Sequence, residues 1–253
     1  EINPDIILMV ETYGSGPFIA DYLNCNFHLV ASKNTSLNDP SVNLSIFSKF
    51  PFGKRIDTEY PFYLGGIEIP INGKIIRFFS NWFHYLPWNN EPEKMGKSVE
   101  ELLEWEKTES RHEMIQKVLP YLKKFANETD SIPMIFGGDM NSLSHLDWTN
   151  KTKTIHNNLV VPWNATEILA DLGLIDSYRK ENPNPITHPG VTWDKKGRKD
   201  SHRIDYIFYK GKSIKSIKSN SYNAYFNESI IINDKQIPYP SDHGIVVTTF
   251  EFR

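Results

Sequence analysis

Short runs of apolar residues recur along the chain of 253 residues, and each run is bounded by polar, glycine- or proline-containing turns. The runs are rich in Ile, Val, Phe and Tyr, a composition and a length typical of β-strands. Asn72-Gly73 stands between two of them and is the strongest short-range signal for a β-hairpin. The residues expected in strands are 5–11, 27–32, 44–50, 62–71, 74–86, 132–141, 203–211 and 244–252.

Helical spacing occurs in two places between these strands. Residues 100–125 place apolar side chains three to four positions apart with charged residues between them, and 165–172 form a shorter candidate. Strands dominate and helices are interspersed, which predicts mixed sheets covered by helices in one domain.

Composition and charge narrow the class of protein. Apolar residues make up 39% of the chain and aromatic residues 13%, which supplies a sizeable core, and no stretch approaches the roughly 20 apolar residues that span a bilayer. The net charge of −3 weighs against a large duplex-DNA footprint, because proteins that bind duplex DNA usually carry a basic face. The single cysteine, Cys25, excludes an internal disulfide and a multi-cysteine metal site.

Polar residues stand at the ends of the predicted strands, where a rigid element holds a side chain still. Taken singly, each has a structural explanation, such as a strand end, a core histidine, an ion pair or a turn. Taken together, several carboxylates with an amide and two imidazoles suit Mg²⁺, Mn²⁺ or Ca²⁺ rather than zinc, and suit water activation in phosphoester hydrolysis. These residues are Glu11, His84, Asp139, Asn141, Asp205, Asp242 and His243.

Gly137 and Gly138 precede Asp139, and we expect them to let the backbone turn tightly beside a bound phosphate, where a Cβ would crowd it. Asp139 and Asn141 are two positions apart, so their side chains leave an extended backbone on the same side. The stretch therefore predicts an edge that holds water and phosphate.

Five segments carry a resemblance to a known family. In order along the chain, NPDIILMVE, SNWFHYL, GGDMNS, RIDYIFY and SDHGIVV resemble the endonuclease/exonuclease/phosphatase superfamily, which includes pancreatic-type deoxyribonucleases, abasic-site nucleases and neutral sphingomyelinases. Within it the sequence is most similar to uncharacterised hydrolase-like members of bacteria, several of which look exported. The resemblance implies an α+β fold, a four-layer α/β/β/α sandwich of two packed, mixed, mostly antiparallel sheets with helices on both outer faces.

The resemblance also implies which residues handle metal and phosphate. Glu11 would bind the metal, Mg²⁺ or Mn²⁺, with Asp242 on the metal side. His84 would contact and polarise the scissile phosphate, and Asn141 would hold a phosphate oxygen. The segment NWFHYL departs from the tighter family pattern, which leaves the alignment of Asn81 open while His84 still fits.

Three residues are implied in activating the water. Asp139 would position or deprotonate the water or steady the leaving group. His243 would be the paired base or a phosphate contact, oriented by Asp205. Which of Asp139 and His243 is the base stays open.

The start of the sequence departs from the family, whose members carry a strand and a helix before the segment that matches residues 3–11. That strand bears an asparagine which helps to position metal or phosphate, and Asn3 falls in the wrong element to replace it. A single domain over residues 1–253 is therefore expected without that strand and helix, either because further sequence precedes Glu1 or because the strand has been lost.

The substrate is less determined than the chemistry. His145, Asp147 and Trp193 are candidate substrate contacts, and the charged loop 191–203 is a candidate selector of the leaving group. A small phosphodiester, a phosphomonoester or a lipid head group is favoured over duplex DNA. The alternatives are a nuclease acting on DNA or RNA and a catalytically impaired binding module. A monomer is expected, and export is favoured over the cytoplasm.

Overall fold

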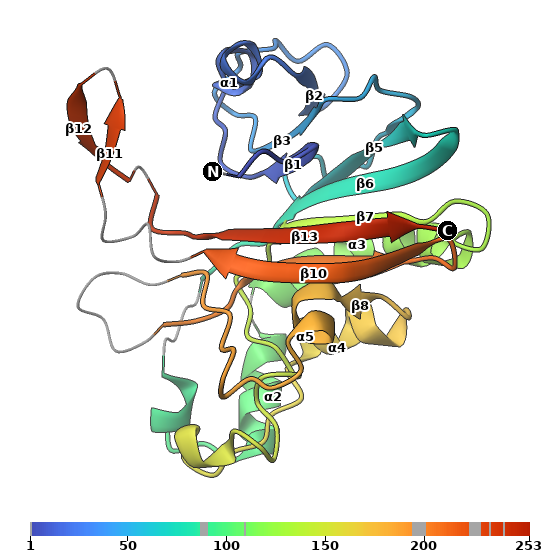
Figure 1. Cartoon of the computed structure of the whole chain (residues 1–253). Helices are drawn as coiled ribbons and strands as arrows, with labels where there is room; N and C mark the ends of the chain where they lie inside the picture. Colours follow the sequence, from blue (N-terminus) through green and yellow to red (C-terminus); the bar gives the residue numbers. More distant parts are fainter. Residues whose placement is uncertain are drawn as a thin grey trace.

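The computed structural model of the protein describes residues 2–86, 91–108, 110–193, 201–222, 229–232, 234–239 and 241–253. Strands and helices follow one another in mixed order along the chain (Figure 1). The strands are β1 (Ile6–Met9), β2 (Asn26–Val30), β3 (Leu44–Ser48), β4 (Arg55–Ile56), β5 (Leu64–Ile71), β6 (Lys74–Trp82), β7 (Met134–Asp139), β8 (Ile175–Asp176), β9 (Asp205–Lys210), β10 (Ile214–Tyr222), β11 (Ser229–Ile232), β12 (Lys235–Pro238) and β13 (Ile245–Phe252). The helices are α1 (Gly16–Leu23), α2 (Val99–Lys107), α3 (Ser110–Asn127), α4 (Asn164–Asp171) and α5 (Ser177–Glu181), with short 3-10 helices η1 (Pro92–Lys94) and η2 (Lys153–Ile155).

The largest sheet has six strands in the order β4-β5-β6-β7-β9-β8. Its neighbours are antiparallel except β6 and β7, which run parallel and are connected through α2 and α3. β5 and β6 form the predicted hairpin, because Asn72 and Gly73 take the positive φ angles (50° and 78°) that its tight turn requires. Since β9 is antiparallel to β7, the ends of β6 and β7 and the start of β9 meet at one edge.

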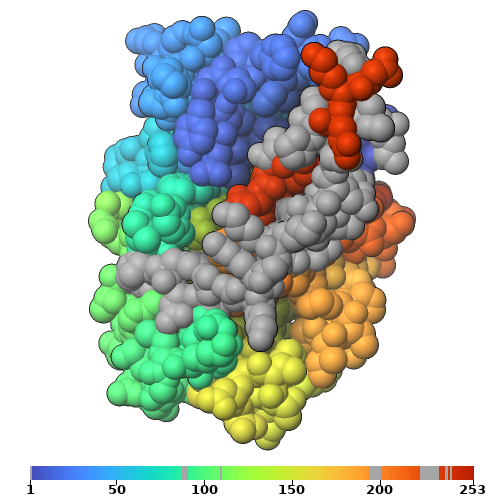
Figure 2. All heavy atoms as spheres, turned by 90° about the vertical axis from the view of Figure 1, so that its left-hand side faces the viewer, coloured from blue at the N-terminus to red at the C-terminus, as the bar shows by residue number. Residues whose placement is uncertain are grey.

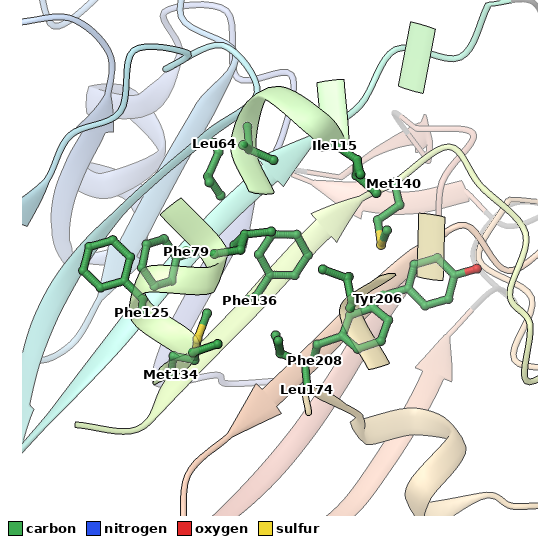
Figure 3. Packing of buried hydrophobic residues seen from close by; sticks show 14 of the residues in the cluster. Leu64, Phe79, Ile115, Phe125, Met134, Phe136, Met140, Leu174, Tyr206 and Phe208 are labelled. Carbon is green, nitrogen blue, oxygen red and sulfur yellow. The ribbon is translucent and has the colours of Figure 1, made fainter. Parts of the chain in front are cut away.

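Helices cover one face of this sheet. Side chains alternate between the two faces along each strand, and Phe79, Phe136 and Phe208 point to the face that packs against Ile115 of α3 and Leu169 of α4. Figure 3 shows Phe79 and Phe136 beside the green helix on this face and Phe208 beside Leu174. None of the helices in the described ranges is long and apolar enough to cross a membrane.

Further strands cover the opposite face. Phe78, Ile135 and Tyr209 pack there against Leu8 of β1 and Phe250 of β13. These strands belong to two sheets, ordered β1-β3-β2 and β10-β13, and β11 and β12 form a separate pair. The α+β class with packed, mostly antiparallel sheets and helices is confirmed. The second layer differs from the single sheet that we expected, because β1 and β13 are not hydrogen-bonded to each other in the described residues.

The long helix expected over residues 100–125 is two helices. Ser98 caps the start of α2 in a capping box, and the Thr108 hydroxyl bonds a carbonyl of the last turn of α2. α3 begins at Ser110, whose hydroxyl donates to the carbonyl oxygen of Leu86. The start of α3 is thus tied to the segment that follows β6, and the periodicity alone did not reveal the break.

Candidate active site

The candidate site lies at the edge where three strands of the six-stranded sheet meet. β6 ends at Trp82, β7 ends at Asp139 and β9 begins at Asp205. In register, Trp82 is opposite Asp139 and Asp139 is opposite Asp205. Strand pairing therefore brings two acidic residues from distant parts of the chain side by side.

Gly138 sets how closely β6 and β7 approach at this edge. Its φ is +150°, and a Cβ added there would lie 1.9 Å from the backbone oxygen of Asn81 on β6. No larger residue fits without moving one of the strands. The glycine is thus explained by strand packing, in place of the close approach to phosphate that the sequence suggested.

Asp139 and Asn141 form one hydrogen-bonded unit. Asp139 is 2% exposed, and its Oδ1 and Oδ2 accept hydrogen bonds from the backbone N–H (2.7 Å) and Nδ2 (2.6 Å) of Asn141. Asn141 Nδ2 also donates to the carbonyl oxygen of Phe83 (2.8 Å). Both amide hydrogens are therefore used within the protein, so Asn141 orients Asp139 in this structure instead of offering its amide to a phosphate oxygen.

Asp205 and His243 form a second unit. His243 Nδ1 lies 3.0 Å from Oδ2 and 3.2 Å from Oδ1 of Asp205, which fixes the ring orientation. Thr192, which is fully buried, supports both partners: its Oγ1 accepts from the N–H of Asp205 and of Ile204 (3.1 Å each), and its carbonyl accepts from Gly244 N–H (2.5 Å). We did not single out Thr192 from the sequence, because a threonine in a loop carries no pattern of its own.

The two units together form a compact group of ionisable side chains. One ligand atom each from Asp139, Asp205 and His243 lies within 4.8 Å of the other two. Burial raises the pKa of Asp139 well above its usual value, and the charge of Asp205 raises it further, while His243 opposes the shift. Burial lowers the pKa of His243, but the Asp205 carboxylate, with Asp139 and Asp242, outweighs burial and raises it to about 10.

Excess negative charge at this edge fits a divalent cation. Carboxylate oxygens are donors that Mg²⁺ or Mn²⁺ accepts, and a cation beside Asp139 would offset the charge of Asp205, which adds to the effect of burial in raising the Asp139 pKa. The compact group is not the pair of ligands that the resemblance implied, since among the described residues it contains neither Glu11 nor Asp242.

Glu11 and Asp242 lie around this group. Glu11 is exposed and follows β1; its N–H donates to Asn43 Oδ1 (3.1 Å), and its charge adds to the effects of burial and of Asp205 that raise the Asp139 pKa. Asp242 is exposed and accepts a hydrogen bond from Trp193 Nε1 (3.1 Å). Both carboxylates act electrostatically on the compact group, Glu11 on Asp139 and Asp242 on His243.

His84 lies just beyond the end of β6, next to a residue whose N–H donates to the Asp139 carbonyl (3.0 Å). Its Nδ1 accepts from Leu86 N–H (3.2 Å), and the Ser110 hydroxyl, which donates to the Leu86 carbonyl, lies 3.1 Å from it. A backbone N–H can donate only to an unprotonated ring nitrogen, so the proton of the neutral ring is on Nε2. Nε2–H is then a hydrogen-bond donor, the property that a phosphate contact needs.

The candidate substrate contacts have protein partners. Asp147 accepts from Arg179 Nε through Oδ1 (2.9 Å) and from Arg203 Nε through Oδ2 (2.8 Å), so both of its oxygens are engaged in a buried ion-pair network. His145 Nδ1 bonds the Thr166 hydroxyl (2.8 Å). These contacts give Asp147 and His145 roles within the fold, and their contact with substrate stays a prediction.

Trp193 is the candidate contact that borders the group formed by Asp139, Asp205 and His243, through its backbone bridge with His243. Its backbone forms bridges with His202 and with His243, and its ring donates to Asp242 as described. In the charged loop predicted to select the leaving group, residues 194–200 lie outside the described residues.

Arg111 of α3 is another residue that the sequence did not mark. It is 4% exposed, and its guanidinium donates to the carbonyl oxygen of Asn141. This contact supports a residue with φ of +46°, a backbone conformation that a non-glycine residue adopts at a cost. An arginine in a helical pattern is normally expected on the surface. Only the packing of α3 against the turn at Asn141 reveals its role.

Sequence comparison matches most of the chain to a known family. Residues 1–243 match the Endonuclease/Exonuclease/phosphatase family. A curated relative, Uncharacterized protein F14F9.5 of Caenorhabditis elegans, is 26% identical over 279 aligned positions, which cover 99% of this chain and 82% of that protein. The bacterial branch expected from the sequence stays a prediction.

Two solved structures illustrate the similarity of fold. D. rerio TDP2 complexed with single strand DNA product has a TM-score of 0.60 and 13% identity, covering 98% of this chain and 86% of that chain. An AP endonuclease from Archaeoglobus fulgidus has a TM-score of 0.59 and 17% identity, covering 98% and 89%. At these identities the likeness shows a common fold.

Proposed function

The chain belongs to the Endonuclease/Exonuclease/phosphatase family and is a phosphoester hydrolase, and on that premise we propose that an activated water attacks phosphorus in line at the edge formed by Asp139, Asp205 and His243. The observation that carries this proposal is the compact group itself, in which buried carboxylates and an imidazole share one edge of a rigid sheet. Buried groups with strongly shifted pKa values in one place are typical of catalytic sites.

Mg²⁺ or Mn²⁺ is the cofactor that we propose, with Glu11 and Asp242 as the residues that would hold it. When bound, a divalent cation polarises a phosphoryl oxygen and neutralises charge on the phosphate. The support is the crowding of carboxylates, because Glu11 and Asp205 both raise the Asp139 pKa. Carboxylate oxygens are the ligands that these cations prefer.

Asp139 and His243 divide the proton handling. With a pKa of about 10, His243 is an imidazolium at neutral pH, which suits a donor to a phosphate oxygen and not a base. Asp139 has a raised pKa, which makes its carboxylate a stronger acceptor for the water proton. We therefore assign the base to Asp139, oriented by Asn141, and assign phosphate contacts to His243 and His84.

The proposed substrate is a small phosphodiester, a phosphomonoester or a lipid head group, and the chain is proposed to act as an exported monomer. The net charge of −3 supports a small substrate over a duplex. A nuclease is the second candidate, favoured by the two fold relatives named for a single-strand DNA complex and for an AP endonuclease. A binding module of the same fold is the third.

We also propose a single domain over residues 1–253, supported by two hydrophobic clusters that share the six-stranded sheet. β1 and β13 each pair with one strand in the described ranges, so each has an edge at which the additional family strand would pair.

The test is a panel of bis- and mono-p-nitrophenyl phosphate, plasmid DNA and phospholipid, each with Mg²⁺, Mn²⁺ or EDTA. We expect metal-stimulated hydrolysis that EDTA abolishes. His243→Ala should lose most of the activity, while His188→Ala, an exposed histidine elsewhere, should retain it. Absence of metal-stimulated hydrolysis would contradict the enzyme, and full activity of His243→Ala would contradict the role of that residue.

A further inference from the structure

Aromatic side chains exposed to solvent are few, and several lie beside the candidate site. In the described part of the chain they are Tyr13, Phe18, Tyr22, Phe62 and Tyr85. Phe18 and Tyr22 lie on α1, whereas Tyr13, Phe62 and Tyr85 come from three separate segments. We call these three residues the aromatic wall.

Tyr13 is joined to the site through Glu11. Its hydroxyl donates to Glu11 Oε1 (3.0 Å), and the Glu11 carboxylate acts on Asp139. The ring is nevertheless 50% exposed.

Phe62 and Tyr85 are joined to the site through His84. The Phe62 ring packs edge-on against Trp82 (5.5 Å between centroids), and Trp82 packs edge-on against His84 (5.7 Å). Tyr85 stacks on the His84 ring (4.8 Å, 20°). Phe62 is 40% exposed and Tyr85 is 45% exposed, so each has one part held by protein and another open to solvent.

A buried amide fixes two segments of the wall relative to each other. Asn43 is 1% exposed; its Oδ1 accepts from the Glu11 N–H (3.1 Å) and its Nδ2 donates to the Phe62 carbonyl (3.1 Å). Asn43 therefore links the wall residue Phe62 to Glu11, which is a proposed metal ligand. Figure 2 faces this end of the sheets, where the blue N-terminal segment borders the teal segment around the end of β6.

Exposed rings held in place beside a phosphate site are suited to stacking on another ring. Aromatic stacking on a base contributes about 1–3 kcal/mol, and a prearranged ring loses little conformational freedom on binding. We propose that Tyr13, Phe62 and Tyr85 bind a planar ring attached to the scissile phosphate, either an unpaired nucleobase or an aryl group. This proposal rests on the proposed function, because the wall selects the substrate of that site.

The test compares methyl phenyl phosphate with methyl cyclohexyl phosphate, two diesters that each carry one ring of similar size, of which only the phenyl ring is planar. The variants are Phe62→Leu, Tyr85→Leu and Tyr13→Leu, with Tyr13→Phe as the version that keeps the ring. Phe18→Leu and Tyr22→Leu are matched controls. Each wall variant should lower the ratio of kcat/KM for phenyl over cyclohexyl by about tenfold, mainly through KM, and the controls should not.

Direct binding separates this proposal from the proposed function. Phenylphosphonate should bind the wild type more tightly than cyclohexylphosphonate in calorimetry, and the wall variants should lose the difference. If the wild type hydrolyses neither diester, the proposed function fails while the binding experiment still decides the wall. An unchanged preference in the wall variants overturns the wall, even if hydrolysis is normal.

Oligonucleotides identify the source of the ring. If wall variants weaken binding of oligothymidylate but not of an abasic strand of equal length, the ring is a nucleobase. If only the phenyl compounds respond, it is an aryl group. Weaker binding to phosphatidylcholine vesicles with an unchanged phenyl preference overturns the proposal in favour of a membrane contact.

Discussion

Replacing Thr192 by valine tests how the fold positions Asp205 and His243. Valine has nearly the shape of threonine, so the substitution removes the hydroxyl oxygen and leaves the packing almost unchanged. That oxygen accepts hydrogen bonds from the N–H groups of Ile204 and Asp205, both at 3.1 Å. Thr192 is fully buried and Ile204 is 1% exposed, so water does not replace the lost acceptor.

The expected cost follows from the two donors left without an acceptor. A buried donor without a partner costs about 1–3 kcal/mol, so the loss of an acceptor for two donors in Thr192→Val should lower the free energy of unfolding by about 2–6 kcal/mol. Thr192→Ser keeps the oxygen and loses one methyl group, which should cost about 1 kcal/mol. Because Asp205 begins β9 and orients His243, the valine variant should also lose about ten- to a hundredfold in kcat.

Urea unfolding followed by tryptophan fluorescence measures the stability, and metal-dependent hydrolysis of bis-p-nitrophenyl phosphate measures kcat. The matched pair makes the result specific, since serine and valine differ in the acceptor. If the valine variant were as stable and as active as the wild type, the Thr192 hydroxyl would not position Asp205. If serine were as damaging as valine, the methyl group would matter and not the oxygen.

Three further outcomes are expected from single changes. Gly138→Ala should lower the free energy of unfolding in urea by about 3 kcal/mol or more, because its Cβ would overlap the neighbouring strand. Gly73→Ala, in an open turn, should cost about 1 kcal/mol, and equal costs for the two variants would contradict the overlap. Burial lowers the pKa of His28 to about 4 from 6.5, so between these pH values the unfolded state binds more protons than the folded state. The free energy of unfolding is therefore full above pH 6.5 and should fall by about 3 kcal/mol toward pH 4, and a His28→Gln variant should lack this loss. Arg203→Met should cost about 3–5 kcal/mol in melting and urea experiments, because it leaves the buried Asp176 carboxylate without its guanidinium (2.6 Å), and wild-type stability would refute that ion pair.

The strands that the sequence predicted are those whose inward side chains are apolar. β6, β7, β9 and β13 were all evident as runs of Ile, Val, Phe and Tyr, and the Asn72-Gly73 turn identified the hairpin. β10 was not predicted, because its inward positions include Ser216 and Ser219. Their hydroxyls bond Glu181 and Thr248, which satisfies them in the interior and hides the strand from a hydrophobicity pattern.

The sequence by itself determined the inventory of the site. Acidic and imidazole side chains at strand ends, with Asp139, Asp205 and His243 in family order, indicated phosphoester hydrolysis before any geometry was known. It also determined that Gly138 was special, although the reason turned out to be the close approach of two strands.

Only the tertiary structure decided which partner each of these residues meets. Asn141 is turned toward Asp139, Asp147 is held between two arginines, and Thr192 and Arg111 support the site from loops and helices with no pattern of their own. Periodicity and side-chain chemistry can be predicted from the sequence, because both depend on a residue and its few neighbours along the chain. The direction of a buried hydrogen bond depends on atoms brought together from distant segments, and that is fixed when the sheets and helices pack.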